Sequence, residues 1–330
     1  MNGRPRREAM RGSSRSAEDG VVRTMGIGGA ATAPSLEIDG VTKRYGDRTV
    51  VDGLTFTVRP GRVTGFLGPN GSGKSTTMKI LLDLASADEG RTAIGGSRYR
   101  DLPDPARTVG VLLEANAFHP GRSGRSHLRM LADAIGVPVA RADALLEEVD
   151  LAPAAGRRVG AYSLGMRQRL GLAAALLGDP PVLVLDEPGN GLDPQGNKKL
   201  RDVLRARAER GHTVLVSSHL LAEMEHLVDE VVVVNRGRLV TTGSLHDLLE
   251  GASLVRSASN ERLRSVLEDE GGVVEPLGGD GLLVRGLPID RIGERAFLSG
   301  IALHELSPHG GSLEDLFLEW TGDVDPAGEG

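Results

Sequence analysis

The stretch at residues 68–76 constrains the fold of this chain more than any other. An apolar, strand-like segment at 62–67 precedes it, and apolar residues at helical spacing follow it. Its three glycines let successive N–H groups point inward, and the start of a helix adds positive partial charge where phosphates would lie. The stretch consists of Gly68, Pro69, Asn70, Gly71, Ser72, Gly73, Lys74, Ser75 and Thr76. The pattern predicts a nucleotide-binding phosphate loop, in which Lys74 reaches the β- and γ-phosphates and the Ser75 hydroxyl suits Mg²⁺.

The composition describes an ordinary soluble protein with room for one large and one small domain. The chain has 330 residues, of which 39% are apolar and 25% are charged. No stretch approaches about eighteen consecutive apolar residues, so we expect no membrane crossing by the chain itself. The net charge of -6 argues against a general nucleic-acid binder, because it repels phosphate. The absence of cysteine excludes disulfides and thiolate metal sites and fits a reducing compartment.

The two ends of the chain lack the pattern of folded elements. Residues 1–33 are rich in Arg, Gly, Ser and Ala, and no apolar segment follows the arginines near the start. We therefore expect a disordered N-terminal tail and not a signal peptide. Residues 323–330 are rich in Gly, Asp and Pro and predict a flexible C-terminal tail.

Three short segments before the phosphate loop predict antiparallel strands. They are residues 36–38, 41–46 and 54–58. Tyr45 lies in a polar turn of this region, and the residues alone leave two interpretations equally open. Its ring could be exposed and stack on a purine, or it could be an ordinary surface or core aromatic. After the loop helix, residues 88–90 predict a turn, and residues 108–113 predict a buried strand that ends at Glu114.

Helices and buried strands alternate in the region that follows. Residues from about 120 to 180 have apolar positions at helical spacing and predict a helical insert. Four apolar residues at 182–185 predict a strand buried on both faces of a parallel sheet, which delivers the pair Asp186-Glu187 at its carboxyl end. A second strand at 213–217 delivers His219 at the corresponding end. Carboxylates in that position face the nucleotide crevice.

Beyond about residue 250, strand-like and helical segments reappear in alternation. They are residues 254–255, 261–268, 282–284, 289–298 and 301–303. We expect a small α+β domain here, closed by a helix at 313–320. No catalytic set of side chains is visible in it.

Taken together, these motifs resemble the ATP-binding subunit of an ABC transporter, in order and spacing over residues 35 to about 245. They are the phosphate loop, Tyr45, Glu114, the 163–168 stretch, Asp186-Glu187 and His219. The Ser-Leu-Gly-Met signature at 163–166 and the Ser-Leu-Glu-Asp-Leu-Phe-Leu ending at 312–318 resemble the type-2 exporter branch, which includes daunorubicin- and bacitracin-resistance ATPases.

This resemblance implies the fold. We expect an α/β P-loop NTPase of the ABC ATPase type, with a mixed sheet core, an antiparallel β subdomain and a helical subdomain. The nucleotide-binding domain would span residues 34–250, with the helical subdomain at about 115–180. The small α+β C-terminal domain would span residues 251–322.

The resemblance also implies how ATP is held. Tyr45 would stack on adenine, while Lys74 and the amides of the phosphate loop would hold the phosphates. Ser75 would coordinate Mg²⁺, with Asp186 placed nearby through the shell of the metal. Glu114 stands where the family normally has glutamine, and its carboxylate could still meet Mg²⁺ or water, although it adds negative charge.

The family's chemistry and assembly carry over to further residues. Glu187 would polarise the attacking water as general base, and His219 would touch the γ-phosphate, so that Glu187, His219 and Lys74 form the catalytic set. The turn at Ser163 and Gly165 of one subunit would cap the γ-phosphate bound to the other, and the short loop that includes Asp193 would cross between subunits. The resemblance thus implies a second copy of the chain in an ATP-sandwich dimer.

The signature departs from the general family pattern, which is Leu-Ser-Gly-Gly-Gln. Here it reads Tyr162-Ser163-Leu164-Gly165-Met166, so the serine and the second glycine are kept while the first glycine and the glutamine are lost. This change and Glu114 both resemble the bacitracin-like branch, and Glu187 and His219 are intact. We therefore expect a competent hydrolase.

The interpretation that follows is an ATP-binding and ATP-hydrolysing subunit at the cytoplasmic face of the cell membrane. It would power export of a small hydrophobic compound, antibiotic or lipid-like substrate through separately encoded transmembrane permease subunits, and no nucleic-acid partner is expected. Two alternatives stay open: a non-transport ABC ATPase switch, and a nucleotide-gated sensor or self-immunity module. The cargo itself is not predicted, because specificity in this architecture lies mostly in the membrane partner.

Overall fold

The structure is a computed structural model that describes residues 33–113, 118–219, 221–249, 252–277, 281–308, 313 and 317, without the side chains of Glu223 and Leu249. The expected tails, up to residue 32 and at 323–330, lie outside the described residues, as does Glu114. Only two residues of the expected helix at 313–320 are described. Within the described ranges, no helix combines the length and the apolar character needed to cross a bilayer.

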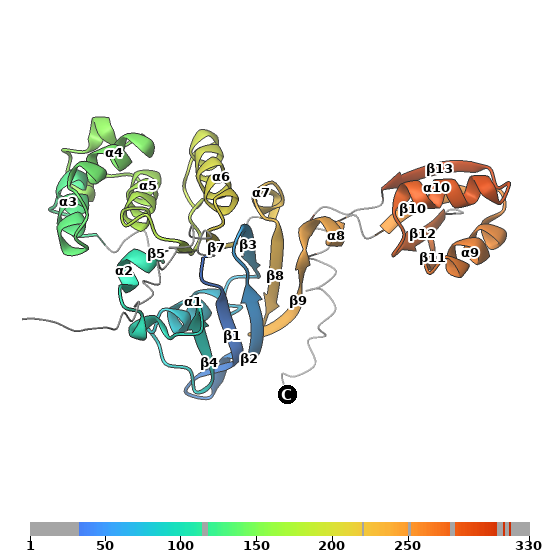
Figure 1. Cartoon of the computed structure of the whole chain (residues 1–330), viewed down its shortest axis with the longest axis horizontal. Coiled ribbons are helices and arrows are strands. Elements are labelled where there is room, and N and C mark those ends of the chain that lie inside the picture. The colour runs from blue at the N-terminus through green and yellow to red at the C-terminus, as the bar shows by residue number, and fades with distance from the viewer. Residues whose placement is uncertain are drawn as a thin grey trace, which may run out of the picture. The chain divides into compact units, whose positions relative to one another are not determined.

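A six-stranded mixed sheet forms the centre of the nucleotide-binding part (Figure 1). Its strands, in spatial order, are β5 Val109–Leu112, β6 Val182–Leu185, β7 Thr213–Ser218, β3 Arg62–Leu67, β8 Glu230–Asn235 and β9 Arg238–Ser244. Neighbouring strands are parallel from β5 to β8, and β9 runs antiparallel to β8. Every residue of β6 is buried, as the run of four apolar residues predicts. The strand β9 is not predicted by the sequence, because its burial alternates and its residues are largely polar.

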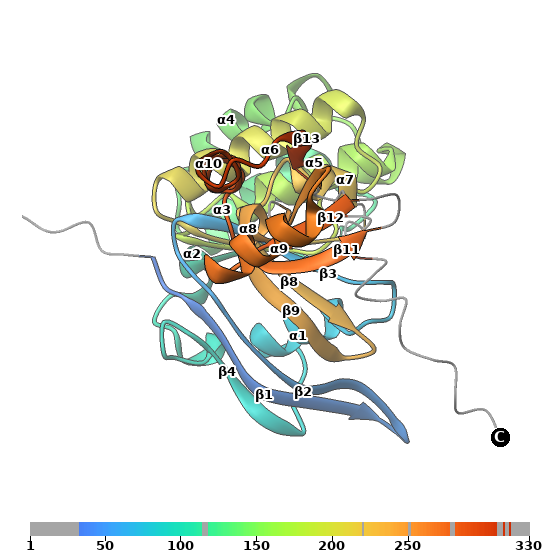
Figure 2. The same ribbon diagram turned by 90° about the vertical axis from the view of Figure 1, so that its right-hand side faces the viewer.

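Helix α1 Lys74–Leu81 shares one hydrophobic core with the central sheet and with a second sheet (Figure 2). This second sheet has three antiparallel strands in the order β2-β1-β4. Its strands are β1 Leu36–Tyr45, β2 Arg48–Val58 and β4 Glu89–Ile94. The predicted turn at 88–90 is wrong, because Glu89 and Gly90 begin β4. Gly90 lies against the neighbouring backbone of β1, where a Cβ atom would be 2.3 Å from the carbonyl oxygen of Gly40. The glycine that suggested a turn therefore permits a close approach of two strands.

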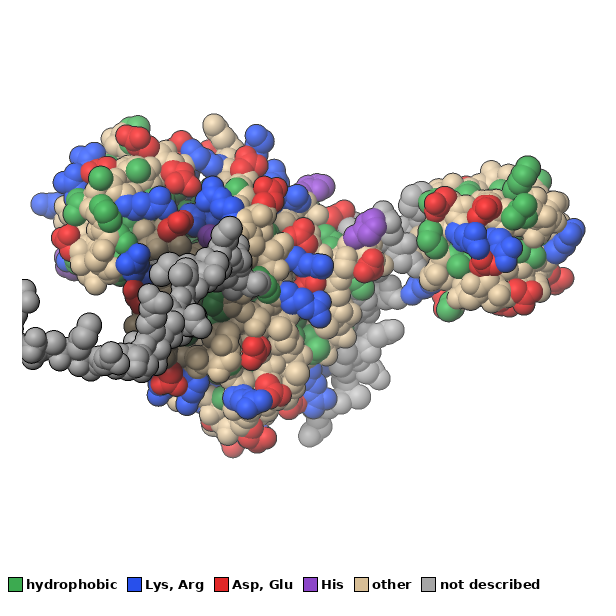
Figure 3. All heavy atoms as spheres, in the orientation of Figure 1, with side chains coloured by type: hydrophobic (Ala, Val, Ile, Leu, Met, Phe, Trp, Pro, Cys, Tyr) green, Lys and Arg blue, Asp and Glu red, His purple; other side chains and the backbone are tan. Residues whose placement is uncertain are grey.

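The predicted helical insert is confirmed as a group of helices with short 3₁₀ turns. The helices are α3 Gly124–Ala134, α4 Ala140–Glu148 and α5 Leu164–Ala175, and the 3₁₀ turns are Ala152–Ala154 and Val159–Ala161. A short helix α2 Pro105–Thr108 and a 3₁₀ turn at Tyr99–Asp101 lie before β5. Basic and acidic side chains are interspersed on the surface of this region (Figure 3). Arg125 and Arg129 both pair with Asp143 at 3.0 and 2.6 Å, and exposed pairs of this kind add little to stability.

Helix α6 Pro194–Glu209 joins β6 to β7. Asp193 caps its first turn by accepting a hydrogen bond from the N–H of Gly196 at 2.9 Å, and Pro194 occupies the first helical position. Two five-residue helices follow, α7 Leu221–Glu225 and α8 Leu245–Leu249.

The region beyond residue 251 forms an antiparallel sheet in the order β11-β12-β10-β13 with its own hydrophobic core. Along the chain its elements are β10 Ala252–Ser257, α9 Asn260–Asp269, β11 Val273–Leu277, β12 Gly281–Arg285, α10 Ile289–Leu298 and β13 Leu303–Pro308. This βαββαβ order with β10 and β12 in the middle is the split βαβ, or ferredoxin-like, arrangement. The small α+β unit expected here is therefore present. The strand β11 contains Pro276 and was not predicted, but as an edge strand it tolerates proline.

Two described residues near the end of the chain contact the nucleotide-binding part. Leu313 is 0% exposed within the large core cluster of that part, and Phe317 packs against the same cluster. The N–H of Leu313 donates to Oε2 of Glu225 on α7 at 3.3 Å. These two residues thus pack with the core that holds α5, β6 and α6, and not with the core of the ferredoxin-like sheet.

Candidate functional site

The sheet order brings three predicted segments to one edge. The phosphate loop follows β3, Asp186-Glu187 follows β6 and His219 follows β7, and these strands are neighbours in the order β6-β7-β3. Leu67 lies opposite Ser218, and Leu185 lies opposite Val216, so the parallel strands end at the same level. Because the carboxyl ends of parallel strands form the binding edge of such a sheet, the residues that follow them gather at one edge.

Lys74 lies inside the phosphate loop. Its Nζ donates to the carbonyl oxygen of Gly68 at 2.6 Å and to that of Pro69 at 3.1 Å, and the residue is 6% exposed. Burial lowers the pKa of Lys74, while the carboxylates of Glu187 and Asp186 act in the opposite direction and raise it. The loop therefore places a buried cation near the two carboxylates that follow β6.

The loop ends in the first turn of α1, with Gly73 at the N-cap position. Its φ of 103° is a conformation open to glycine and rare for other residues. A Cβ atom on Gly73 would also lie 2.7 Å from the carbonyl oxygen of Val50, so both the turn and the space require glycine. The side chain of Ser75 in this first turn is exposed, where it can meet a ligand of the loop.

Ser217 on β7 connects the two carboxylate residues. Its hydroxyl donates a short hydrogen bond to Oδ1 of Asp186 and accepts one from the N–H of Glu187 at 2.9 Å. Asp186 is 8% exposed and Ser217 is 0% exposed, so both bonds are shielded from water. The sequence did not point to Ser217, because a serine near the end of an apolar strand carries no motif of its own.

Glu187 is held by three further contacts. Its Oε2 lies 2.7 Å from Nδ1 of His219, and its main-chain oxygen accepts a hydrogen bond from Nε2 of Gln168 at 3.0 Å and from the N–H of Asn190 at 3.1 Å. Its φ is 50°, in the left-handed region that residues other than glycine rarely adopt. Gln168 was also missed by sequence reasoning, because it acts on the backbone of a residue far along the chain.

The signature residues form a second group. Ser163 caps α5 by accepting a hydrogen bond from the N–H of Met166 at 3.2 Å. A Cβ atom on Gly165 would lie 2.5 Å from the carbonyl oxygen of Gly191, so the signature turn and the loop after β6 touch through their backbones. Ser163, Gly165 and Asp193 line one hollow, whose described lining includes no residue of the phosphate loop. Within one chain, these residues are therefore not brought together with the loop.

Tyr45 is the last residue of β1 and is 54% exposed. The Nζ atom of Lys43 lies 5.2 Å from the centroid of its ring, a cation–π distance. The exposed ring excludes a core position, and it agrees both with a ring that stacks on a purine and with an ordinary surface aromatic. No described contact joins Tyr45 to the phosphate loop.

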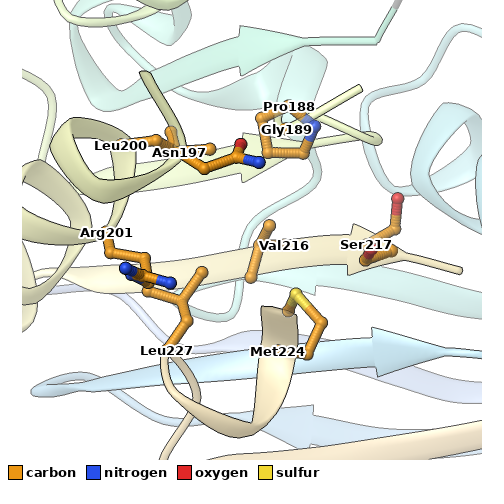
Figure 4. Close-up of a pocket in the computed structure, with 10 residues that line it drawn as sticks. Pro188, Gly189, Asn197, Leu200, Arg201, Val216, Ser217, Met224 and Leu227 are labelled. Carbon is orange, nitrogen blue, oxygen red and sulfur yellow. The ribbon is translucent and has the colours of Figure 1, made fainter. Parts of the chain in front are cut away.

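A small pocket lies between the loop after β6, helix α6, strand β7 and helix α7 (Figure 4). Pro188 and Gly189 lie on one side of it and Met224 on the other, and Ser217 lies at the end of β7 on its border. Val216 and Leu227 give it a largely apolar lining. No residue of the phosphate loop lines this pocket.

Comparisons with known proteins agree with one another. Residues 51–190 match the family model described as ABC transporter, and residues 251–314 match a domain of unknown function. YhcH, an uncharacterised ABC transporter ATP-binding protein of Bacillus subtilis (strain 168), is 36% identical over 294 residues, which are 88% of this chain and 96% of that protein. The daunorubicin resistance ATP-binding protein DrrA3 of Streptomyces coeruleorubidus is 34% identical over 310 residues, with the same two shares of 88% and 96%.

A solved structure of the ATP binding subunit of an ABC transporter superposes on the chain with a TM-score of 0.60 and 27% identity. The superposition covers 79% of this chain and 99% of that one. It confirms the predicted fold class, a P-loop NTPase of the ABC ATPase type. Because both sequence relatives also align over nearly their whole lengths, the chain belongs to the ATP-binding proteins of ABC transporters and is a cassette ATPase.

Proposed function

We propose that the crevice at the ends of β3, β6 and β7 hydrolyses ATP with Glu187 as general base. The observation that carries this assignment is the contact of 2.7 Å between Glu187 Oε2 and His219 Nδ1, beside the buried Lys74. A base must be held within hydrogen-bond reach of the group it acts on, and Glu187 is fixed at its N–H, its carbonyl oxygen and its carboxylate. His219 orients the carboxylate and contacts the γ-phosphate, while Lys74 holds the β- and γ-phosphates.

The oxygen atoms of Ser75 and Asp186 are suitable ligands for Mg²⁺. This ion takes hard oxygen ligands and is usually bound by one or two carboxylates together with phosphate oxygens and water. The hydroxyl of Ser75 is exposed at the first turn of α1, and Asp186 is held through Oδ1 by Ser217. Ser75 and Asp186 would hold the ion, which when bound neutralises the charge that develops on the phosphates. We also propose, from the resemblance, that the carboxylate of Glu114 meets Mg²⁺ or water.

We further propose that the ATPase works as a dimer of two copies. The signature hollow at Ser163, Gly165 and Asp193 lies apart from the phosphate loop of the same chain, so these residues serve a nucleotide bound by a second copy. The N-terminus of α5 offers N–H groups and positive partial charge to a γ-phosphate. Tyr45, exposed at the end of β1, would stack on the adenine.

The proposed cellular role is export of a small hydrophobic compound, antibiotic or lipid-like substrate through separate transmembrane permease subunits. The name of one relative, a daunorubicin resistance ATP-binding protein, supports this role. The protein would then lie at the cytoplasmic face of the membrane, attached through the permease. The domain bounds stay a proposal: residues 34–250 for the nucleotide-binding domain, about 115–180 for its helical subdomain and 251–322 for the C-terminal domain. Within the last range, Leu313 and Phe317 pack with the core of the nucleotide-binding part.

Hydrolysis of Mg²⁺-ATP by the wild type and by Glu187→Gln tests the proposal, with the oligomeric state of both measured in ATP. Loss of a general base lowers the rate about 10²- to 10⁴-fold. We expect Glu187→Gln to lose turnover in this range and to accumulate as an ATP-dependent dimer. Glu147→Gln on the exposed face of α4 is the matched control and should keep wild-type turnover. Turnover that survives in Glu187→Gln contradicts the assignment of Glu187 as the base. If Glu187→Gln stays monomeric in the presence of ATP, the proposed ATP-sandwich dimer is contradicted.

A further inference from the structure

Gln168 joins the signature helix α5 to the loop that carries Glu187. Its side chain is 5% exposed, and its Nε2 donates to the main-chain oxygen of Glu187 at 3.0 Å. A carbonyl oxygen can only accept, so the amide must present its NH₂ group at this contact. The bond therefore holds the peptide of Glu187 from an element that is not part of the sheet.

The backbone of Glu187 needs such support. A residue other than glycine with a φ of 50° persists where its surroundings over-determine the conformation. The N–H of Glu187 is held by Ser217 on β7 at 2.9 Å, and its carbonyl oxygen accepts from Asn190 within the same loop at 3.1 Å. Among the hydrogen bonds of the described residues, the bond from Gln168 is the one that ties this peptide to α5.

Helix α5 holds the loop after β6 at three places. The backbone of Gly165 touches that of Gly191, Gln168 bonds Glu187, and Nη2 of Arg169 donates to Oδ1 of Asp193 at 2.9 Å. Positions three and four apart on a helix share one face, so residues 165, 168 and 169 present a single surface to the loop. A displacement of α5 is therefore passed directly to the loop.

Packing alone does not explain a glutamine at this position. Its Oε1 is buried and has no hydrogen-bond partner among the residues that the structure describes. An unpaired buried amide oxygen is unfavourable, and an apolar side chain of similar length would fill the same space without it. The bond to Glu187 is what the glutamine adds.

We propose that Gln168 is the positioning residue that couples the signature helix to the general base. The inference rests on the proposed function, in which Glu187 is the base and the start of α5 meets the nucleotide of a second copy. Contact of that nucleotide with Ser163 and Gly165 then sets the position of α5, and Gln168 passes this position to Glu187 in its own subunit's site. Nucleotide bound in one site thereby changes the position of Glu187 in the other site. Gln168 acts on turnover and leaves ATP binding unchanged.

The variant Gln168→Met tests the coupling because it keeps the length of the side chain and removes the donor. A misplacement of about 1 Å in a reacting group can lower a rate about 100-fold. We expect kcat to fall about 10- to 100-fold, with an unchanged KM for ATP and an unchanged ATP-dependent dimer. Leu172→Ala is the control, since it removes a buried side chain one turn further along α5. It should lower the melting temperature and keep kcat at temperatures below its unfolding.

A second variant, Gln168→Glu, keeps the shape and places an acceptor against the carbonyl oxygen, so it should lose at least as much turnover. Wild-type kcat in a folded Gln168 variant overturns the coupling. So does a loss of kcat that follows the melting temperature as in Leu172→Ala, or a failure of both variants to fold, because either result assigns Gln168 a purely structural role. Turnover in Glu187→Gln contradicts the proposed function itself. An inactive Glu187→Gln beside a fully active Gln168→Met overturns the coupling alone.

Discussion

Nδ1 of His219 lies 2.7 Å from Oε2 of Glu187, although the two residues belong to loops after different strands. Their strands β6 and β7 are parallel neighbours, so the order of the sheet creates the contact. The imidazole restrains the carboxylate of Glu187, while Ser217 and Gln168 hold the N–H and the carbonyl oxygen of the same residue. The orientation of the carboxylate is therefore set by three separate elements.

Removal of the imidazole tests the first of these restraints. His219→Ala should lower kcat about 10²-fold or more, because the carboxylate loses its partner and, under the proposed function, the γ-phosphate loses a contact. Steady-state hydrolysis of Mg²⁺-ATP measures this loss. His226→Ala, which removes an exposed imidazole shortly after α7, is the matched control and should keep wild-type turnover. Equal rates for His219→Ala and the wild type would remove His219 from the catalytic set.

Ser217→Ala should affect both stability and turnover. The change leaves Oδ1 of Asp186 and the N–H of Glu187 without their buried partner, which costs about 1–3 kcal/mol of unfolding free energy. Chemical unfolding and ATP hydrolysis measure the two effects.

The control for Ser217→Ala lies at the opposite end of the same strand. Thr213→Val removes the bond of 2.7 Å from Oγ1 of Thr213 to the carbonyl oxygen of Pro34, far from the carboxylates. We expect it to lower stability by a similar amount and to keep turnover. If both variants lose the same fraction of activity, Ser217 has no specific role at the site.

Asp83 predicts a pH-dependent contribution to stability. It accepts hydrogen bonds from the N–H of Arg100 at 3.0 Å, from Nη2 of Arg100 at 2.8 Å and from Nη2 of Arg98 at 3.0 Å. Burial by itself raises the pKa of Asp83, but these hydrogen bonds outweigh it and hold the pKa below its usual value of 3.8. A carboxylate with a lowered folded-state pKa stabilises the fold above its unfolded pKa, and this stabilisation is lost as the pH falls through the folded pKa.

Asp83→Asn should therefore lower the unfolding free energy by about 1–2 kcal/mol at neutral pH. The difference from the wild type should shrink as the pH falls below 3.8. Urea unfolding at several pH values measures both. Asp39→Asn, at an exposed pair with Arg91, should change stability little at any pH. A difference that grows on acidification would show that the sign of the linkage is wrong.

Leu263→Ala tests whether the ferredoxin-like sheet is stabilised by its own core. Leu263 on α9 is 0% exposed within that core, and truncation of a buried leucine costs about 2–5 kcal/mol. We expect calorimetry to show a lower melting temperature for one transition, while ATP hydrolysis below that temperature stays unchanged. Glu261→Ala, exposed on the same helix, should leave both transitions in place. A parallel loss of ATPase activity and of this transition would contradict separate cores.

Much of the site could be predicted because its motifs are contiguous in the sequence. The phosphate loop, the Asp186-Glu187 pair and His219 each follow an apolar strand, and parallel pairing brings strand ends together. Ser217 and Gln168 could not be found in this way. They act through hydrogen bonds to a residue 30 and 19 positions away, and no local pattern records such a contact.

The elements that the sequence missed are those with weak or contradictory local signals. The second residue of strand β4, Gly90, suggests a turn until its close approach to Gly40 is known. The strand β11 contains Pro276, and its edge position, which makes the proline tolerable, depends on a topology that only the structure supplies. The resemblance to the family implies the fold of the cassette, but it does not imply the order of the strands beyond residue 251.

The pairing of β10 with β13 places Ser253 opposite Pro308, so the chain enters and leaves the ferredoxin-like sheet side by side. A few residues later, Leu313 is already buried in the core that holds α5 and β6. In topological terms the sheet is an insertion: its first and last strands are neighbours, and Leu313, which follows it, again belongs to the core of the cassette. Such a unit can be exchanged, enlarged or removed without stretching the chain on either side, while the contact of Leu313 with the cassette is preserved.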